Sequence, residues 1–140
     1  MLSNRSIPRA TVIPVLAYPD VNQAAGWLCD AFGFTSRLRI GDHRVQLNVG
    51  DGAVTLRELR DNEVDAPLAI GHSLTIRVED ADAHCKRARA HGARITQEPV
   101  TQPYGERQYN ADDLAGHSWT FSQSVADKAP EEWGGTAVQL

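Results

Sequence analysis

The sequence predicts an α+β fold in which two copies of one unit follow each other, each with a strand, a helix and three further strands. The first observation is a pair of stretches with apolar residues at helical spacing, each preceded by an aspartate and closed by a glycine. The second is that short runs with strand character flank both stretches. The third is a nearly constant offset, which is 60 positions between Asp20 and Asp80, 59 between Gly33 and Gly92, and 64 between Gly52 and Gly116. Such an offset indicates an internal repeat.

The first unit begins with an apolar and β-branched run over residues 11–17, which stops at Tyr18-Pro19-Asp20 and predicts a strand. Asp20 then precedes a helix, and Gln23 stands three residues later, where a capping box would place it. The apolar residues of this helix are Ala24, Trp27, Leu28, Ala31 and Phe32. Gly33 closes the helix, and we expect Trp27 to lie in the core.

Three more strands are predicted in the first unit, at residues 36–40, 44–49 and 53–59. Gly41-Asp42-His43 separates the first two, and Asp51-Gly52 turns into the third. The polar stretch 60–66, which ends at Pro67, has no periodicity and predicts a linker.

The second unit repeats this order. Residues 73–78 alternate polar and apolar side chains, which predicts a half-buried strand. Asp80 begins a helix that runs to about His91 and is closed by Gly92, and strands follow at 95–97, 107–111 and 118–122. Neither unit could cover its own sheet in so few residues. We therefore expect one domain over residues 1–140, with modules at about 10–60 and 70–124 and a tail at 125–140.

Composition excludes several classes of partner. The 140 residues include 14 Lys+Arg and 18 Asp+Glu, a net charge of −4, with no dense basic run. Nucleic acids and anionic membranes both require concentrated positive charge, so we expect neither as a partner. No apolar stretch approaches the roughly 20 residues that span a bilayer, and no apolar signal region begins the sequence, so we expect a cytoplasmic protein. Cys29 and Cys85 fall in the predicted helices and are expected to be buried free thiols.

Four segments carry a resemblance to a known family: PVLAYPD at 14–20, AFGF at 31–34, HSLTIRVED at 72–80, and YGERQY at 104–109 running into DLAGHSWTF at 113–121. With its doubled unit, the chain resembles the vicinal oxygen chelate superfamily, which groups glyoxalase I, bleomycin resistance proteins and extradiol dioxygenases. Leu114 replaces the proline of that family's usual Asp-Pro-x-Gly turn. The resemblance implies two curled, antiparallel-rich sheets around a concave cavity that holds a ligand, helices on the convex side, and a homodimer.

The resemblance also implies where a metal would lie. Enzymes of the family hold a divalent cation with four inward-facing side chains, typically His or Glu, from the first and last strands of both units. Counting from Asp20, Val78 and the two turn glycines places Ile13, Ser73, Leu56 and Thr120 at these positions, or Thr55 or Arg57 in place of Leu56 if that strand has the other register. None of these side chains is a competent imidazole or carboxylate ligand. We therefore expect no metal and no other cofactor.

The five histidines are the candidate imidazole ligands. His72 neighbours a ligand position, but strand alternation groups it with Leu74 and Ile76, on the side expected to pack on a helix. A bulge could turn it inward, with Glu58 as its one obvious companion. His84 and His91 are two helical turns apart, about 10 Å, which is too far to share one ion. His43 and His117 are expected to face solvent.

Candidate ligand-binding residues come from strand alternation and from the segment that could close the cavity. They are Ser73, Thr75, Arg77, Ser118 and Thr120 on the strands, Tyr104, Arg107 and Tyr109 in the closing segment, and Arg57 in the first unit. Phenol rings and a guanidinium suit flat ligands and carboxylates. The alternatives are that this sheet face merely meets water and that residues 104–109 are an ordinary surface loop.

Two functions follow from these expectations. The favoured one is a metal-free protein that binds an apolar or aromatic small molecule in the sheet cavity, as bleomycin resistance proteins sequester an antibiotic. Bleomycin itself fits less well, because it is cationic and the expected inward residues are neutral or arginine. The alternative is an enzyme, a glyoxalase-like lyase or dioxygenase that uses His72 and Glu58 with a metal, or a metal-free enzyme. The sequence favours the binding protein and identifies neither ligand nor catalytic residue.

Overall fold

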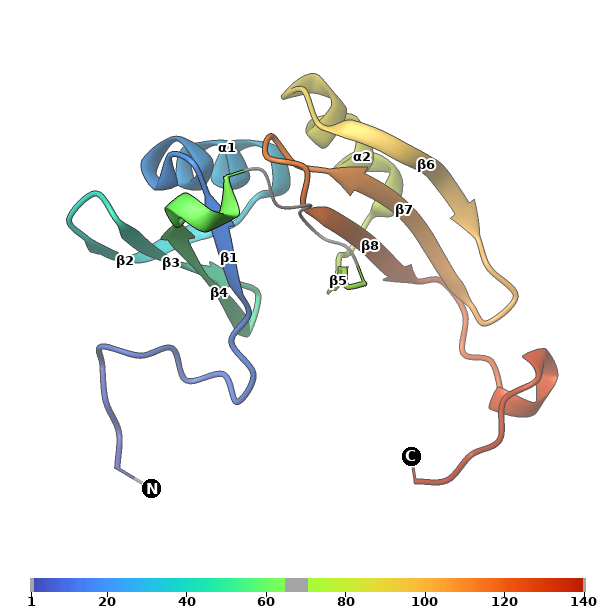
Figure 1. Ribbon diagram of the computed structural model, residues 1–140. Coiled ribbons are helices and arrows are strands. Elements are labelled where there is room, and N and C mark those ends of the chain that lie inside the picture. The colour runs from blue at the N-terminus through green and yellow to red at the C-terminus, as the bar shows by residue number, and fades with distance from the viewer. Residues whose placement is uncertain (1, 65–70, 140) are drawn as a thin grey trace. The chain divides into compact units, whose positions relative to one another are not determined.

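Each repeat of the sequence forms one four-stranded sheet with one helix against it (Figure 1). The structure is a computed structural model that describes residues 2–64 and 71–139. It divides into two compact units, Met1–Ile70 and Gly71–Leu140. The predicted doubled arrangement of strand, helix and three strands is confirmed. Residues 65 and 66 of the predicted linker at 60–66 lie outside the described residues. In its described part, Asp61–Glu63 forms the short 3-10 helix η1.

In the first unit the strand order is β1-β4-β3-β2, with β1 parallel to β4 and the other pairs antiparallel. Its elements are β1 (Val15–Tyr18), α1 (Val21–Phe32), β2 (Thr35–Ile40), β3 (Arg44–Val49) and β4 (Gly52–Glu58). The second unit repeats this topology as β5-β8-β7-β6, with β5 parallel to β8. Its elements are β5 (Leu74–Arg77), α2 (Ala81–Ala90), β6 (Arg94–Thr101), β7 (Glu106–Asp112), β8 (Ser118–Ser124) and the 3-10 helix η2 (Pro130–Trp133).

β6 is longer than the predicted strand at 95–97, because it continues through Pro99 to Thr101. Pro99 has no N–H to donate to a neighbouring strand. β6 is the edge strand of its sheet, and its register with β7 shifts between Gln97 and Val100. An edge position and a register shift are the two settings in which a strand accepts proline.

Both helices begin where the sequence places their caps. The Asp20 carboxylate accepts a hydrogen bond from the Gln23 backbone N–H at 3.0 Å, and the Asp80 carboxylate accepts one from Ala83 N–H at 3.0 Å. Gly33 closes α1 with φ of +80°, a left-handed conformation that glycine adopts without strain. Among the described residues, no helix combines the length and apolar character that crossing a membrane requires.

The helices cover one face of each sheet, and the buried residues follow strand alternation. α1 packs on β3 and β4, where every second side chain is fully buried: Val45, Leu47, Val54 and Leu56. In the second unit His84 of α2 lies against Phe121, with ring centroids 4.3 Å apart, and Trp119 and Tyr109 extend the same buried layer. Cys85 is buried in this layer and Cys29 is half-buried, and neither forms a disulfide within the described residues.

The turn before β8 is held by Asp113 rather than by a proline. Its buried carboxylate accepts hydrogen bonds from the backbone N–H groups of Ala115 and His117, both at 3.0 Å, and from Trp119 Nε1 at 3.1 Å. These hydrogen bonds hold the turn in place without a proline at position 114. His117, expected in solvent, is buried, and its backbone N–H and carbonyl both bond to Asp113.

Candidate functional site

The face of the second sheet opposite α2, which we call the polar face, carries a continuous row of polar side chains. Its register brings Thr75, Thr120 and Asn110 into one row across three strands, and Arg77, Ser122 and Gln108 into the next. Each of these residues alternates with a residue of the buried layer. The polar face includes Thr75, Arg77, Glu106, Gln108, Asn110, Asp112, Ser118, Thr120, Ser122 and Ser124.

Hydrogen bonds link these side chains to one another. Gln108 Nε2 donates to Ser122 Oγ at 3.0 Å, and Ser122 Oγ donates to Glu106 Oε1 at 2.6 Å. Thr120 Oγ1 donates to Asn110 Oδ1 at 2.8 Å in the neighbouring row. Hydrogen bonds from the hydroxyls of Ser122 and Ser124 hold the pKa of the Glu106 carboxyl below its usual range. Glu106 is therefore a fixed negative charge on this face at neutral pH.

A hollow of about 940 Å³, which we call the C-terminal hollow, adjoins one end of the polar face. Its aromatic wall consists of Tyr104 and Trp133, whose ring centroids lie 5.2 Å apart, and its charged lining includes Arg77, Glu106 and Lys128. The Tyr104 hydroxyl donates to Gln108 Oε1 at 2.9 Å, which joins the hollow to the hydrogen bonds of the polar face. The hollow is open to solvent, and it combines aromatic rings with a few polar groups, as ligand sites do.

Gly105 fixes the chain that forms this hollow. The backbone N–H groups of Val125 and Ala126 donate to Gly105 O at 2.8 and 3.2 Å, so the tail is fastened to the turn between β6 and β7. Gly105 has φ of +85°, and a Cβ there would lie 2.3 Å from the Ala126 carbonyl oxygen. Only glycine fits this approach. Trp133 lies at the end of η2 in the same tail.

Most of the predicted site residues of the second unit lie on the polar face or beside it. Thr75, Arg77, Ser118 and Thr120 lie on the polar face, and Tyr104 lines the C-terminal hollow. Ser73 is exposed immediately before β5, with the alternation of Thr75. Arg77 Nη1 donates to Ser124 Oγ at 3.2 Å.

Tyr109 and Arg107 lie on the opposite, helix-covered face, which corrects the prediction for both. Tyr109 is fully buried, stacks on Phe121 with centroids 5.1 Å apart, and bonds through its hydroxyl to Nδ1 of His84. Burial raises the pKa of this phenol above its usual value. Arg107 binds the carboxylate of Asp82 in α2 at 2.9 to 3.1 Å.

The physical reason for this correction is that Arg107 and Tyr109 belong to the strand predicted at 107–111, observed as β7, and not to a loop that closes the cavity. Alternation then separates neighbours onto opposite faces, so Tyr109 and Ala111 face the helix while Gln108 and Asn110 face away. Gln108 and Asn110 were therefore missed as site residues. Their polar character between Tyr109 and Ala111 was the signal that could have found them.

Arg57 lies on the helix-free face of the first sheet, where it is held by an ion pair. Leu56 pairs with Val45 and is buried, which places Thr55 and Arg57 on the other face. Two guanidinium nitrogens of Arg57 donate to the two carboxylate oxygens of Glu63 at 2.8 and 2.6 Å. Chiefly through these bonds, the pKa of the Glu63 carboxyl falls to about 2. This pairing engages the guanidinium that was expected to meet a ligand.

The model of the Glyoxalase/Bleomycin resistance protein/Dioxygenase superfamily matches residues 10–121. The chain belongs to this superfamily. Among solved structures, TioX from Micromonospora sp. ML1 is similar at 35% identity and a TM-score of 0.68, covering 83% of this chain and 99% of TioX. No curated protein sequence matches the chain.

More distant structures of the superfamily share the fold. A lactoylglutathione lyase from Agrobacterium tumefaciens has 20% identity and a TM-score of 0.62, covering 84% of this chain and 96% of its own. A glyoxalase/bleomycin resistance protein/dioxygenase family enzyme from Burkholderia phytofirmans PsJN has 15% identity and a TM-score of 0.69, covering 81% and 97%. At these identities the likeness concerns the fold alone.

The side chains at the superfamily's metal positions do not fit a divalent cation. The register of β4 puts Thr55 and Arg57, not Leu56, on the helix-free face, so the positions that the resemblance assigns to a metal hold Ile13, Thr55 or Arg57, Ser73 and Thr120. None of these side chains supplies an imidazole or a carboxylate, the groups that suit such an ion. Within residues 2–64 and 71–139, no three His, Cys, Asp or Glu side chains gather in a way that could hold a metal.

His72 and Glu58 remain unsuited to replace these ligands. His72 is exposed and precedes β5. Glu58 shares its alternation with Leu56, the buried residue that faces α1.

The Arg57–Glu63 pair predicts a pH dependence. In a carbon-detected NMR titration of the folded protein, the Glu63 carboxyl should titrate near pH 2, and Arg57→Gln should raise its midpoint toward 4.5. Because the folded pKa is lowered, the pair stabilises the fold above about pH 4.5, and this contribution is lost as the pH falls toward 2. Arg39→Gln removes the same charge from β2 and should leave the midpoint in place. A Glu63 midpoint that ignores Arg57→Gln would contradict the pairing.

Gly105 predicts a second outcome. Gly105→Ala should lower the free energy of unfolding by about 3 kcal/mol, because left-handed strain adds to the clash with Ala126. Gly92→Ala is the matched control: its φ is +89°, but a Cβ there meets nothing within 4 Å, so strain alone should cost about 1 kcal/mol. Urea denaturation measures both. Equal losses in the two variants would mean that the tail does not press on Gly105.

Proposed function

We propose that the protein binds a small aromatic molecule without a metal, in the C-terminal hollow and along the adjoining polar face. The observation that carries this proposal is the pairing of Tyr104 and Trp133 beside Arg77 and Glu106. Two rings give a flat ligand a stacking surface, and the charged groups fix its orientation. The hydrogen bond from Tyr104 to Gln108 holds one of these rings in place before a ligand arrives.

Binding is favoured over catalysis by the chemistry of the groups on this face. The hydroxyl and amide groups of the polar face bond to each other, so they form a prepared surface rather than an activated nucleophile with its base. Glu106 lines the hollow that the rings form, and its lowered pKa makes it a weak base at neutral pH. The side chains at the expected metal positions include no imidazole or carboxylate that could hold a Lewis-acidic cation.

Metal content tests the metal-free part of the proposal. Protein purified without chelators and then titrated with Zn, Ni, Mn and Fe should retain less than one-tenth equivalent of any ion by mass spectrometric metal analysis. Native mass spectrometry of the same sample would show any copurified organic molecule. One tightly held ion per chain would overturn the proposal in favour of a metal-dependent lyase or dioxygenase.

The rings predict an effect on affinity. With 2-naphthol as a neutral planar probe, Trp133→Ala and Tyr104→Ala should each weaken binding roughly tenfold, because each removes one stacking partner. Trp27→Phe is the matched control, since Trp27 packs on Phe32 in α1 with ring centroids 5.1 Å apart. Probe fluorescence measures the three affinities. If the tail variants bind as tightly as the parent protein, the hollow is not the aromatic site.

We extend the proposal to a cytoplasmic homodimer that sequesters its ligand, including an antibiotic, as the name of the superfamily suggests. Sedimentation at micromolar concentration should then give particles of about twice 15.3 kDa. Particles of the single-chain mass alone would contradict the dimer.

A further inference from the structure

The N-terminal segment 5–10, which we call the arm, crosses the helix-free face of the first sheet. Gln46 Nε2 donates to the Ser6 carbonyl at 2.9 Å, and Arg37 Nη2 donates to the carbonyls of Arg5 and Ile7 at 2.9 and 3.2 Å. Arg37 Nη1 also donates to Gln46 Oε1 at 2.5 Å. Gln46 is buried although it is polar, because the arm covers it. Three hydrogen bonds thus fasten the arm to the sheet.

A bulge in β2 directs Arg37 toward the arm. Ser36 pairs with Leu47 and Leu38 pairs with Gln46, so Arg37 is the extra residue between them. A bulge places successive side chains on one face and can re-aim a side chain. Arg39 pairs with Val45, whose side chain faces α1, and so lies on the other side of the sheet.

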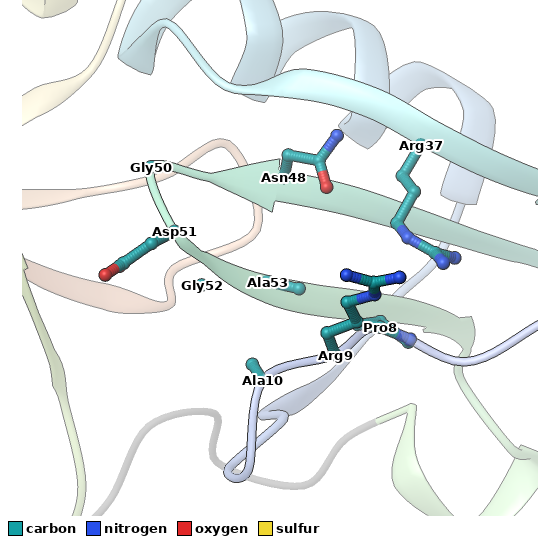
Figure 2. Close-up of a pocket in the computed structure, with 9 residues that line it drawn as sticks. All are labelled: Pro8, Arg9, Ala10, Arg37, Asn48, Gly50, Asp51, Gly52 and Ala53. Carbon is teal, nitrogen blue, oxygen red and sulfur yellow. The ribbon is translucent and has the colours of Figure 1, made fainter. Parts of the chain in front are cut away.

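The arm and the sheet enclose a hollow of about 260 Å³, which we call the arm hollow (Figure 2). Its floor is made of small residues at the β3–β4 turn, where Gly50, Gly52 and Ala53 leave space above the backbone. Around this floor stand Arg9 from the arm, Arg37 from β2 and Asn48 from β3. The volume is below that of most pockets for whole drug-sized molecules, so it suits one functional group of a ligand or a very small ligand.

The charges around the arm hollow are unbalanced. Arg9 and Arg37 both line it, and neither forms an ion pair among the described residues. Figure 2 shows the Asp51 carboxylate pointing away from both guanidinium groups. Of its five N–H donors Arg37 uses three in the bonds to Gln46, Arg5 and Ile7, which leaves two for another partner.

We propose that the arm hollow binds a carboxylate group, held by Arg9 and Arg37, with the Asn48 amide as a further donor. A planar carboxylate matches the fork of donors that the Arg9 guanidinium presents, and Arg37 would add a single N–H from Nε or Nη1. The anion would also relieve the repulsion between two cations that share one small space. The proposal goes beyond the C-terminal hollow, because this site in the first unit recognises an anion whether or not the second unit holds an aromatic ring.

Titration with benzoate tests this site, followed through the backbone amides of Asn48, Gly50, Gly52 and Ala53 in ¹H–¹⁵N NMR spectra. Benzoate should shift these amides to saturation. Benzamide, its neutral counterpart, should bind at least tenfold more weakly, and Arg9→Gln should weaken benzoate binding at least tenfold. Arg39→Gln, which removes an equal charge from the other side of β2, should leave the affinity unchanged.

Arg37→Gln separates anchoring from binding. Arg37→Gln should weaken benzoate binding and also shift the amide signals of Ser6 and Ile7, because Arg37 fastens the arm. Arg9→Gln should leave those two amide signals in place. The proposal is overturned if benzamide binds as well as benzoate, if Arg39→Gln weakens binding as much as Arg9→Gln, or if inorganic phosphate binds tenfold more tightly than benzoate.

Discussion

Burial of one face of each sheet under a helix is the constraint on which the rest of the molecule depends. Because strand side chains alternate, packing Val45, Leu47 and Leu56 on α1 fixes the side on which Gln46, Thr55 and Arg57 lie. The same constraint in the second unit separates Tyr109 and Phe121 from Gln108 and Ser122. A shift of one residue would exchange a buried hydrophobic layer for a polar one, so each sheet has one energetically acceptable register.

Polar side chains on the two helix-free faces find their hydrogen-bond partners in different ways. In the first unit, the chain's own arm covers part of the face, and Arg37 and Gln46 satisfy its carbonyl groups. In the second unit, the side chains form hydrogen bonds between β7 and β8, and the tail adds Trp133 beside Tyr104. One repeated topology therefore offers two chemically distinct recesses, one lined by guanidinium groups and one by aromatic rings.

Membership of the superfamily fixes the topology but leaves the chemistry to individual side chains. At the positions that the resemblance assigns to a cation, this chain carries no imidazole or carboxylate, and the Glu106 carboxylate on the polar face is held as an anion by serine hydroxyls. A surface of neutral hydrogen-bonding groups with fixed charges at its margins is suited to recognition. Its specificity would come from ring stacking and charge, not from a shared ion.

The sequence alone determined the doubled unit, the helix caps at Asp20 and Asp80 and the hydrophobic period of most strands, because these depend on contacts close along the chain. It also placed Thr75 and Thr120 on one face, since alternation is local. Tertiary structure decided the rest. The length of β6, the face occupied by Arg107 and Tyr109, and the pairing of Arg57 with Glu63 all depend on which strand or helix lies alongside. The arm and the tail carry no periodicity, so their places on the sheets follow only from hydrogen bonds and ring contacts between residues distant in sequence.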